Sequence, residues 1–277
     1  MDFSLLKNRL EKLSFIYQKA INASIEASKV IMEIYKNEFQ SNLKNDGSPV
    51  TDADFASSSV IDKLLSETNI PILSEESIHQ DYSERKKWNL NWCVDPLDGT
   101  KEFIKKNNQF AVNIALIENH EPIFGVIASP TEQFVLFGGK NTGVYIADFE
   151  SIENLEKWKK LDSKKTSNNP LVMTTSHSPN SGASLEYIEK LKLTFSEINF
   201  IKKGSALKFF DLALGKADIY PRFAPTMEWD IAAGQAIIEE LGGSITSVDT
   251  GEKLVYNKEN LLNPHFIALT KPLIKLF

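Results

Sequence analysis

Cysteine is almost missing from this 277-residue chain, in which Cys93 is the single example. One cysteine cannot form a disulfide within the chain, so a reducing compartment such as the cytoplasm is expected. The sequence also lacks a long hydrophobic run, and its charged first residues do not resemble a signal peptide. We therefore expect a cytoplasmic protein with no integral membrane segment, and weak peripheral association with the inner membrane stays open.

An excess of basic residues is missing as well, because 31 Lys and Arg stand against 37 Asp and Glu. The resulting net charge of −6 argues against a nucleic-acid partner. An acidic protein that handles an anionic substrate needs local positive charge or a metal ion. The hydrophobic share of 42% is ordinary for a globular protein, and the length allows one large domain or two subdomains.

Hydrophobic periodicity divides the chain into two unlike halves. Apolar residues at three- and four-residue spacing predict a helix over about 5–35, and a second helix follows residue 51. Alternating residues over 110–147 predict four strands in a meander, and residues 79–87 are expected to form a polar surface loop. After a polar connection over 148–169, strands and helices alternate. We expect an N-terminal α+β subdomain, 1–150, and a C-terminal α/β subdomain, 151–277.

The most informative stretch is Trp92–Phe103, WCVDPLDGTKEF. Its first residues are of strand type, and the proline and glycine that follow favour a turn, so Asp95 and Asp98 are expected just past a strand end. Two anions this close repel one another, and a hard divalent cation such as Mg²⁺ removes the repulsion. The alternative is an ordinary Asp-Pro and Asp-Gly turn without chemistry.

Five acidic residues share one local context, the junction between an apolar strand and a turn or helix start. They are Asp54, Glu75, Asp95, Asp98 and Asp230. Each has a structural alternative, such as helix capping for Asp54 or a favourable helix-dipole charge for Asp230. Together they supply ligands for at least two metal ions and a base for a water molecule, as a metal-dependent phosphoryl hydrolase requires.

A second group of residues suggests an anion site. Gly204 and Ser205 are expected to begin a helix whose free amides can receive a phosphate, with Lys208 in its first turn. Arg222 ends a predicted strand and can form a fork for a second phosphate. A plain helix cap and a surface charge are the respective alternatives.

These motifs together resemble the lithium-sensitive, Mg²⁺-dependent phosphatases related to inositol monophosphatase. The resemblance rests on Glu75-Glu76, on Asp95–Thr100 (DPLDGT) and on Trp229–Gly234 (WDIAAG), and it extends over about residues 44–270. The Lys101-Glu102-Phe103 that follows the second motif is similar to the bacterial 3′(2′),5′-bisphosphate nucleotidase branch of the family.

The resemblance implies an α/β fold layered as an αβαβα sandwich, with two to three Mg²⁺ ions between its halves. It implies metal ligation by Glu75, Asp95, the Leu97 carbonyl, Asp98 and Asp230. Asp54 and Thr100 would orient and deprotonate the attacking water, and Glu76 would shape the site from outside the ligand set. The implied substrate-binding residues are Gly99, Thr100 and Lys101 for the phosphate, Ser205, Lys208 and Arg222 for the nucleotide, and the ligands Glu75, Asp98 and Asp230.

The implied activity is hydrolysis of adenosine 3′,5′-bisphosphate to AMP and phosphate, which clears a by-product of sulfate assimilation. The implied partner is therefore a small nucleotide bisphosphate, and the protein is expected to be a monomer or a homodimer. An inositol phosphatase or other sugar-phosphate phosphatase with the same chemistry stays open. A non-catalytic phosphate-binding protein is a more distant alternative, since no ligand or base is missing from the motifs.

Overall fold

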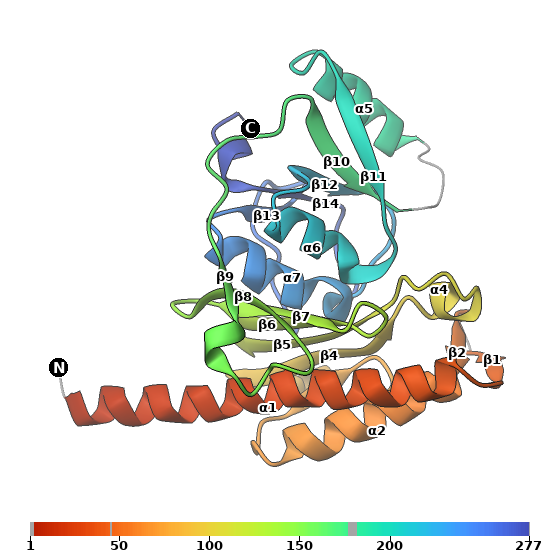
Figure 1. Ribbon diagram of the computed structural model, residues 1–277, viewed down its shortest axis with the longest axis vertical. Coiled ribbons are helices and arrows are strands. Elements are labelled where there is room, and N and C mark those ends of the chain that lie inside the picture. Colours follow the sequence, from red (N-terminus) through yellow and green to blue (C-terminus); the bar gives the residue numbers. More distant parts are fainter. Residues whose placement is uncertain (1–2, 45, 177–181, 277) are drawn as a thin grey trace.

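Two antiparallel helices cover one face of the larger sheet. The structure is a computed structural model that describes residues 3–44, 46–176 and 182–276. Helix α1 (Phe3–Tyr35) and helix α2 (Asp52–Ser66) lie side by side beneath the sheet (Figure 1). Between them, strands β1 (Ser41–Leu43) and β2 (Pro49–Thr51) form an antiparallel hairpin. Both helices occur where the hydrophobic periodicity predicted them.

The larger sheet has seven strands in the order β3-β4-β5-β6-β7-β8-β9. Its first strand is parallel to its neighbour, and the other pairs are antiparallel. The predicted four-stranded meander is therefore confirmed, within a longer series of strands. The strands are β3 (Ile72–Ser74), β4 (Leu90–Asp98), β5 (Ala111–Glu118), β6 (Glu121–Ser129), β7 (Phe134–Gly139), β8 (Gly143–Asp148) and β9 (Lys159–Leu161).

Strand β4 is longer than the sequence predicted. Asp95 and Asp98 lie within this strand and pair with Asn113 and Ala111 of β5, whereas the sequence placed both carboxylates beyond its end. The register shifts between the two aspartates, so Pro96 interrupts the ladder without ending it. The two carboxylates are consequently held by the sheet and not by a free turn.

The second half contains a smaller sheet of five strands in the order β11-β10-β12-β14-β13. Helix α5 (Ala183–Lys192) covers its outer face in Figure 1, and helices α6 (Lys208–Ala213) and α7 (Glu228–Glu240) lie between the two sheets. This layering is the αβαβα sandwich that the resemblance implied. The strands are β10 (Leu171–Thr175), β11 (Ile198–Lys202), β12 (Ile219–Arg222), β13 (Ser244–Ser247) and β14 (Phe266–Leu269).

The remaining elements are single turns. Helix α3 (Tyr82–Arg85) interrupts the segment that was expected to be a polar surface loop, and the side chain of Arg85 is buried. Helix α4 (Thr100–Ile104) follows β4 directly. The 3₁₀ turns are η1 (Leu155–Lys157), η2 (Ser205–Leu207) and η3 (Lys271–Leu273).

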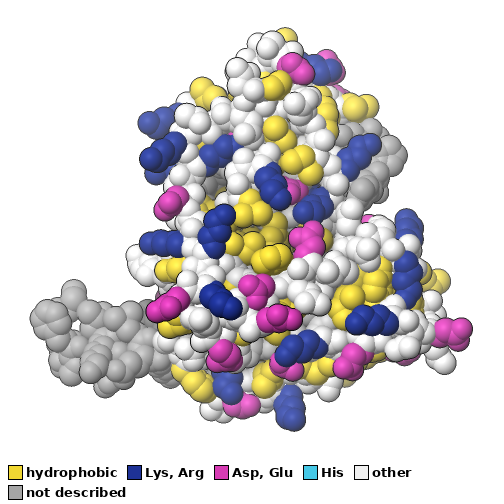
Figure 2. Space-filling model, in the orientation of Figure 1, with side chains coloured by type: hydrophobic (Ala, Val, Ile, Leu, Met, Phe, Trp, Pro, Cys, Tyr) yellow, Lys and Arg dark blue, Asp and Glu magenta, His cyan; other side chains and the backbone are white. Residues whose placement is uncertain are grey.

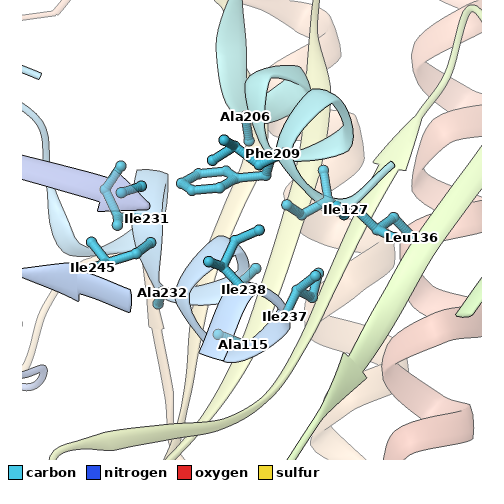
Figure 3. Packing of buried hydrophobic residues seen from close by; sticks show 14 of the residues in the cluster. Ala115, Ile127, Leu136, Ala206, Phe209, Ile231, Ala232, Ile237, Ile238 and Ile245 are labelled. Carbon is cyan, nitrogen blue, oxygen red and sulfur yellow. The ribbon is translucent and has the colours of Figure 1, made fainter. Parts of the chain in front are cut away.

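The layer between the sheets packs closely around α7. Figure 3 shows the ring of Phe209 from α6 beside apolar side chains of α7, β6 and β7, among them Ile231 and Ile127. A Cβ at Gly234 would lie 2.4 Å from a ring carbon of Phe209, so only glycine allows this approach. The position of α7 is therefore fixed from both sides, and with it the position of Asp230.

The connection between the halves is more structured than predicted. Residues 148–169 include η1 and β9, and β9 pairs with β8 in the larger sheet.

On the face shown in Figure 2, basic and acidic side chains are interspersed. Among the described residues, the structure contains no helix with the length and apolar character needed to cross a membrane.

Candidate active site

Three carboxylates from different parts of the chain meet between the sheets. Asp95 and Asp98 come from β4, and Asp230 comes from the first turn of α7. One oxygen atom from each lies within 4.8 Å of the others. Such a distance allows one cation to contact all three. Both the N-terminal and the C-terminal half of the chain therefore contribute to a candidate metal centre.

The surroundings of these carboxylates disfavour three bare anions. Burial, followed by the charges of Glu75 and Asp98, raises the pKa of Asp95 well above its usual range. Burial and the charge of Asp98 raise the pKa of Asp230 to about 8. The backbone amide of Leu97 donates to Asp95 (3.0 Å), and that of Met227 donates to Asp230 (2.8 Å). Asp230 is therefore both a helix-capping residue and a member of the cluster.

Glu75 lies just past β3, where its backbone amide donates to Val94 (3.1 Å) of the adjacent strand. The ammonium group of Lys44, from the β1–β2 hairpin, donates to Glu75 (2.8 Å) and to Glu76 (2.5 Å). Burial alone would lower the pKa of Lys44, but these two hydrogen bonds raise it. Glu76 thus borders the site through Lys44.

The donor set suits a hard cation. The clustered carboxylates of Asp95, Asp98 and Asp230 offer only oxygen atoms, which Mg²⁺ prefers over nitrogen and sulfur. Glu75 is not part of this group of three, and its ligation, like that of the Leu97 carbonyl, stays a prediction. Burial raises the pKa of Glu75 too, so a bound cation would stabilise the ionised form of the whole cluster. The residues present therefore fit Mg²⁺.

Asp54 and Thr100 form the second element of the site. The hydroxyl of Thr100 donates to Asp54 (2.9 Å) and lies 3.3 Å from the Leu97 carbonyl oxygen. The other oxygen of Asp54 accepts from the amide (2.7 Å) and hydroxyl (2.6 Å) of Thr51, which completes a capping box at the start of α2. The capping alternative and the contact with Thr100 therefore coexist in one carboxylate.

Gly99 provides the turn between β4 and α4. Its φ of +99° lies in the left-handed region, and a Cβ there would lie 3.0 Å from the carbonyl oxygen of Gln109 and 3.3 Å from the Cβ of Ser205. Thr100 is the next residue. The close approach of Ser205 to β4 and the placement of the Thr100 hydroxyl therefore depend on the same turn.

The donor groups at the helix start Gly204-Ser205 are occupied by a carboxylate of the protein itself. The Ser205 hydroxyl donates to Asp98 (2.7 Å), and the Ala206 amide donates to the same oxygen. The sequence predicted that these groups would face a phosphate or nucleotide. In the structure they donate to the Asp98 carboxylate of the candidate metal centre, because β4 brings Asp98 to the start of η2.

Beside the acidic cluster lies a cavity of about 240 Å³. Lys208 lies in its wall, buried, with its ammonium donating to the Ser205 (2.7 Å) and Lys203 (3.2 Å) carbonyls. Burial lowers its pKa to about 8. The other residues that line this cavity are Asp98, Lys101, Glu102, Ser176, Gly204, Ser205, Ala206, Phe209, Tyr220, Arg222, Thr226, Asp230 and Ile231.

Arg222 also lines this cavity. Its guanidinium donates to the Ser176 hydroxyl (2.6 Å), while its buried Nε has no hydrogen-bond partner in the described structure. An unpartnered guanidinium nitrogen is costly, so this side chain is suited to an additional anionic ligand. All three cations predicted for substrate binding, Lys101, Lys208 and Arg222, therefore line one cavity.

Two residues of the site were missed by the sequence analysis. Lys44 lies in a hairpin whose only signal was its turn composition, and its contact with Glu75 spans 31 residues. Asn113, opposite Asp95 on β5, donates to Asp98 (3.4 Å) from a buried position. It looked like one polar residue in an alternating strand, and only the sheet register shows its place under the cluster.

Comparisons with known proteins agree with this architecture. The chain is 37% identical over 275 residues to the 3′(2′),5′-bisphosphate nucleotidase CysQ of Buchnera aphidicola, with 94% of this chain and 97% of the relative covered. It is 38% identical to CysQ of Escherichia coli K12, with 87% and 94% covered. The crystal structure of CysQ from Bacteroides thetaiotaomicron matches with a TM-score of 0.82 at 39% identity, over 92% of this chain and 97% of that one.

A more distant structure shares the fold alone. The inositol monophosphatase from Anabaena matches with a TM-score of 0.70 at 24% identity, over 94% of this chain and 92% of that one. The model of the inositol monophosphatase family matches residues 12–275. The resemblance that the three acidic motifs suggested is thereby confirmed, and this chain belongs to the inositol monophosphatase family.

Proposed function

We propose that this protein is a Mg²⁺-dependent 3′(2′),5′-bisphosphate nucleotidase that converts adenosine 3′,5′-bisphosphate to AMP and phosphate. The observation that carries the proposal is the cavity in which Lys208 and Arg222 lie beside the acidic cluster. A substrate with two phosphates needs one cationic contact away from the reacting phosphate, and these two side chains supply it. Similarity to bisphosphate nucleotidases over nearly the whole chain supports the same assignment.

Glu75, Asp95, Asp98, Asp230 and the Leu97 carbonyl would hold two to three Mg²⁺ ions. When bound, these ions lower the pKa of a water molecule and neutralise charge on the leaving 3′-oxygen. The water oxygen bonds to phosphorus as the bond from phosphorus to the 3′-oxygen breaks. The leaving oxygen takes up a proton and becomes the 3′-hydroxyl of AMP.

Asp54 and Thr100 are the pair that would handle the proton of this water. The Thr100 hydroxyl donates to Asp54, so its lone pairs are free to accept a hydrogen bond from water. Burial raises the pKa of Asp54 despite its hydrogen bonds from Thr51 and Thr100, which makes the carboxylate a better proton acceptor. This arrangement supports general-base catalysis through the threonine.

The two halves of the chain would then have different roles in catalysis and substrate binding. Residues 1–150 would supply most metal ligands and the Asp54–Thr100 pair, with Gly99 and Lys101 at the reacting phosphate. Residues 151–277 would supply Asp230 and the nucleotide contacts. The lone cysteine fits a reducing compartment, so we place the activity in the cytoplasm.

The decisive experiment measures phosphate release by the purified protein with Mg²⁺. Adenosine 3′,5′-bisphosphate, inositol 1-phosphate and fructose 1,6-bisphosphate are compared, each with and without Li⁺. The proposal expects a strong preference for the nucleotide and inhibition by Li⁺. Preference for inositol 1-phosphate or fructose 1,6-bisphosphate would overturn the substrate assignment and keep the chemistry. No release from any of the three would instead favour a phosphate-binding protein.

A further inference from the structure

The segment 256–263, here named the strap, wraps the first turn of α7. The carboxylate of Glu228, the first residue of α7, is fully buried and accepts three hydrogen bonds from the strap. They come from the Asn257 amide (2.6 Å), the Lys258 amide (3.0 Å) and the Lys258 ammonium (2.6 Å). A buried carboxylate satisfied in this way is a rigid attachment point.

The strap continues to hold α7 beyond this point. The Glu228 amide donates to the Leu261 carbonyl (3.0 Å), and the Asn263 side chain donates to the Met227 carbonyl (2.7 Å). Asp230 follows two residues later on the same turn. The position of this candidate metal ligand therefore depends directly on the strap.

Arg85 joins the strap to the segment that carries Glu75. The residue is 4% exposed. Its guanidinium donates to the side-chain oxygen of Asn257 (2.8 Å), and the side-chain NH₂ group of Asn257 donates to the backbone carbonyl of Arg85 (2.7 Å). Arg85 also donates to the Lys258 carbonyl (3.2 Å) and, through Nε, to the Gln80 carbonyl (3.0 Å). Burying a guanidinium is costly, and this one donates three hydrogen bonds, two to the strap and one to the Gln80 carbonyl of its own segment.

The loop between Glu75 and Arg85 also contacts α7. The His79 ring nitrogen lies 2.7 Å from the Ser74 carbonyl oxygen, so the loop folds back on the end of β3. The same ring packs against Trp229, with 5.5 Å between ring centroids. Glu75 and Asp230 therefore belong to two segments that meet twice, once at His79 and Trp229 and once at Arg85 and Asn257.

We propose that Arg85 is a positioning residue for divalent cation binding, because it fixes the Glu75 loop relative to the α7 turn that carries Asp230. This inference rests on the metal site of the proposed function. Arg85 contacts neither ligand, so it acts through Asn257 and the strap. Residues that orient metal ligands from outside the ligand set typically change metal affinity 10- to 100-fold when they are replaced.

The test measures Mn²⁺ binding to metal-free protein by the electron paramagnetic resonance signal of free Mn²⁺, without substrate. We expect Arg85→Met and Asn257→Ala each to raise the dissociation constant about tenfold. The double variant is expected to bind no more weakly than the weaker single variant, because both changes break the same Arg85–Asn257 contact. Should Arg85→Met not fold, Arg85→Lys keeps the charge but loses the fork, and it is expected to weaken binding in the same direction.

Lys164→Met is the matched control. Lys164 is a partly buried cation that forms an ion pair with Asp218 (2.7 Å), which does not belong to the site. Its loss is expected to lower the melting temperature and leave Mn²⁺ affinity unchanged. Unchanged affinity in the Arg85 variants would overturn the proposal, as would equal weakening by Lys164→Met. If the unaltered protein binds no Mn²⁺, the metal site itself is wrong, and the proposal fails with it.

Discussion

The hydroxyl of Thr100 donates to the carboxylate of Asp54 across 46 residues of sequence, at 2.9 Å. Asp54 belongs to the capping box of α2, and Thr100 begins α4 after the left-handed turn at Gly99. The capping bonds occupy one carboxylate oxygen and leave the other for Thr100. A local helix signal thus holds one partner of the proposed proton relay in place.

Replacing Thr100 with valine removes the hydroxyl and keeps the shape of the side chain. We expect kcat to fall about 10²- to 10⁴-fold, as for the loss of a general base, with Mn²⁺ affinity changed less than about threefold. Steady-state kinetics and Mn²⁺ titration check both values. Thr131→Val is the control, because its hydroxyl donates to the Asn108 carbonyl at the surface. Near-normal kcat in Thr100→Val would rule out the relay.

Lys44→Met should destabilise the metal-free protein. The substitution leaves Glu75 and Glu76 without their cation. We expect the free energy of unfolding to fall by about 1–3 kcal/mol, and the melting temperature by about 2–4 °C for each kcal/mol. Saturating Mg²⁺ should recover most of the loss, since the metal takes over the charge compensation. Lys29→Met, which removes an exposed pair with Glu26, is expected to change nothing measurable. An equal loss with and without Mg²⁺ would contradict this role of Lys44.

The charge of Lys208 should control how well the bisphosphate binds at alkaline pH. Its pKa is lowered to about 8, so the ammonium loses its proton as the pH rises through that value. We expect kcat/KM for adenosine 3′,5′-bisphosphate to fall above about pH 8, up to tenfold per pH unit. Lys208→Ala should raise KM about tenfold for the bisphosphate, and less for a simple monophosphate. Equal effects on both substrates would remove Lys208 from nucleotide selection.

The stability of the metal-free protein should fall as the pH rises. The pKa of Asp230 is raised from its ordinary value of 3.8, which applies to the unfolded chain, to about 8 in the folded protein. Between these pH values the folded protein keeps a proton that the unfolded chain has lost. The stabilisation that this proton contributes to the folded state is complete below pH 3.8 and disappears as the pH approaches about 8. Thermal melts with a chelator at pH 6, 7 and 8 check the slope. Asp230→Asn should flatten it, and an unchanged slope in that variant would assign the effect to other groups.

Mg²⁺ should counteract this loss. Protons and Mg²⁺ compete for the same carboxylates, so the rise in melting temperature on adding Mg²⁺ should be larger at pH 8 than at pH 6. The same melts measure it. A rise that is independent of pH would indicate that the cation binds away from the raised carboxylates.

Periodicity and turn residues predicted most elements in the right order, because helices and strands differ in the spacing of their apolar positions. The errors fall where tertiary structure overrides a local signal. Pro96 reads as a strand end, yet the ladder with β5 continues past it to Asp98. Arg85 lies in a polar stretch that reads as solvated, yet Asn257 and Gln80 satisfy its guanidinium inside the protein.

The acidic motifs and the alternation of elements are properties of the sequence alone, and the family resemblance that the motifs carry was enough to indicate the layered fold. Which groups meet was decided only by tertiary structure. The amide of Ala206 faces Asp98, and the ammonium of Lys44 faces Glu75. Local patterns carry no information about such pairs, because the contacts join segments that lie 31 residues apart for Lys44 and Glu75 and 108 residues apart for Ala206 and Asp98.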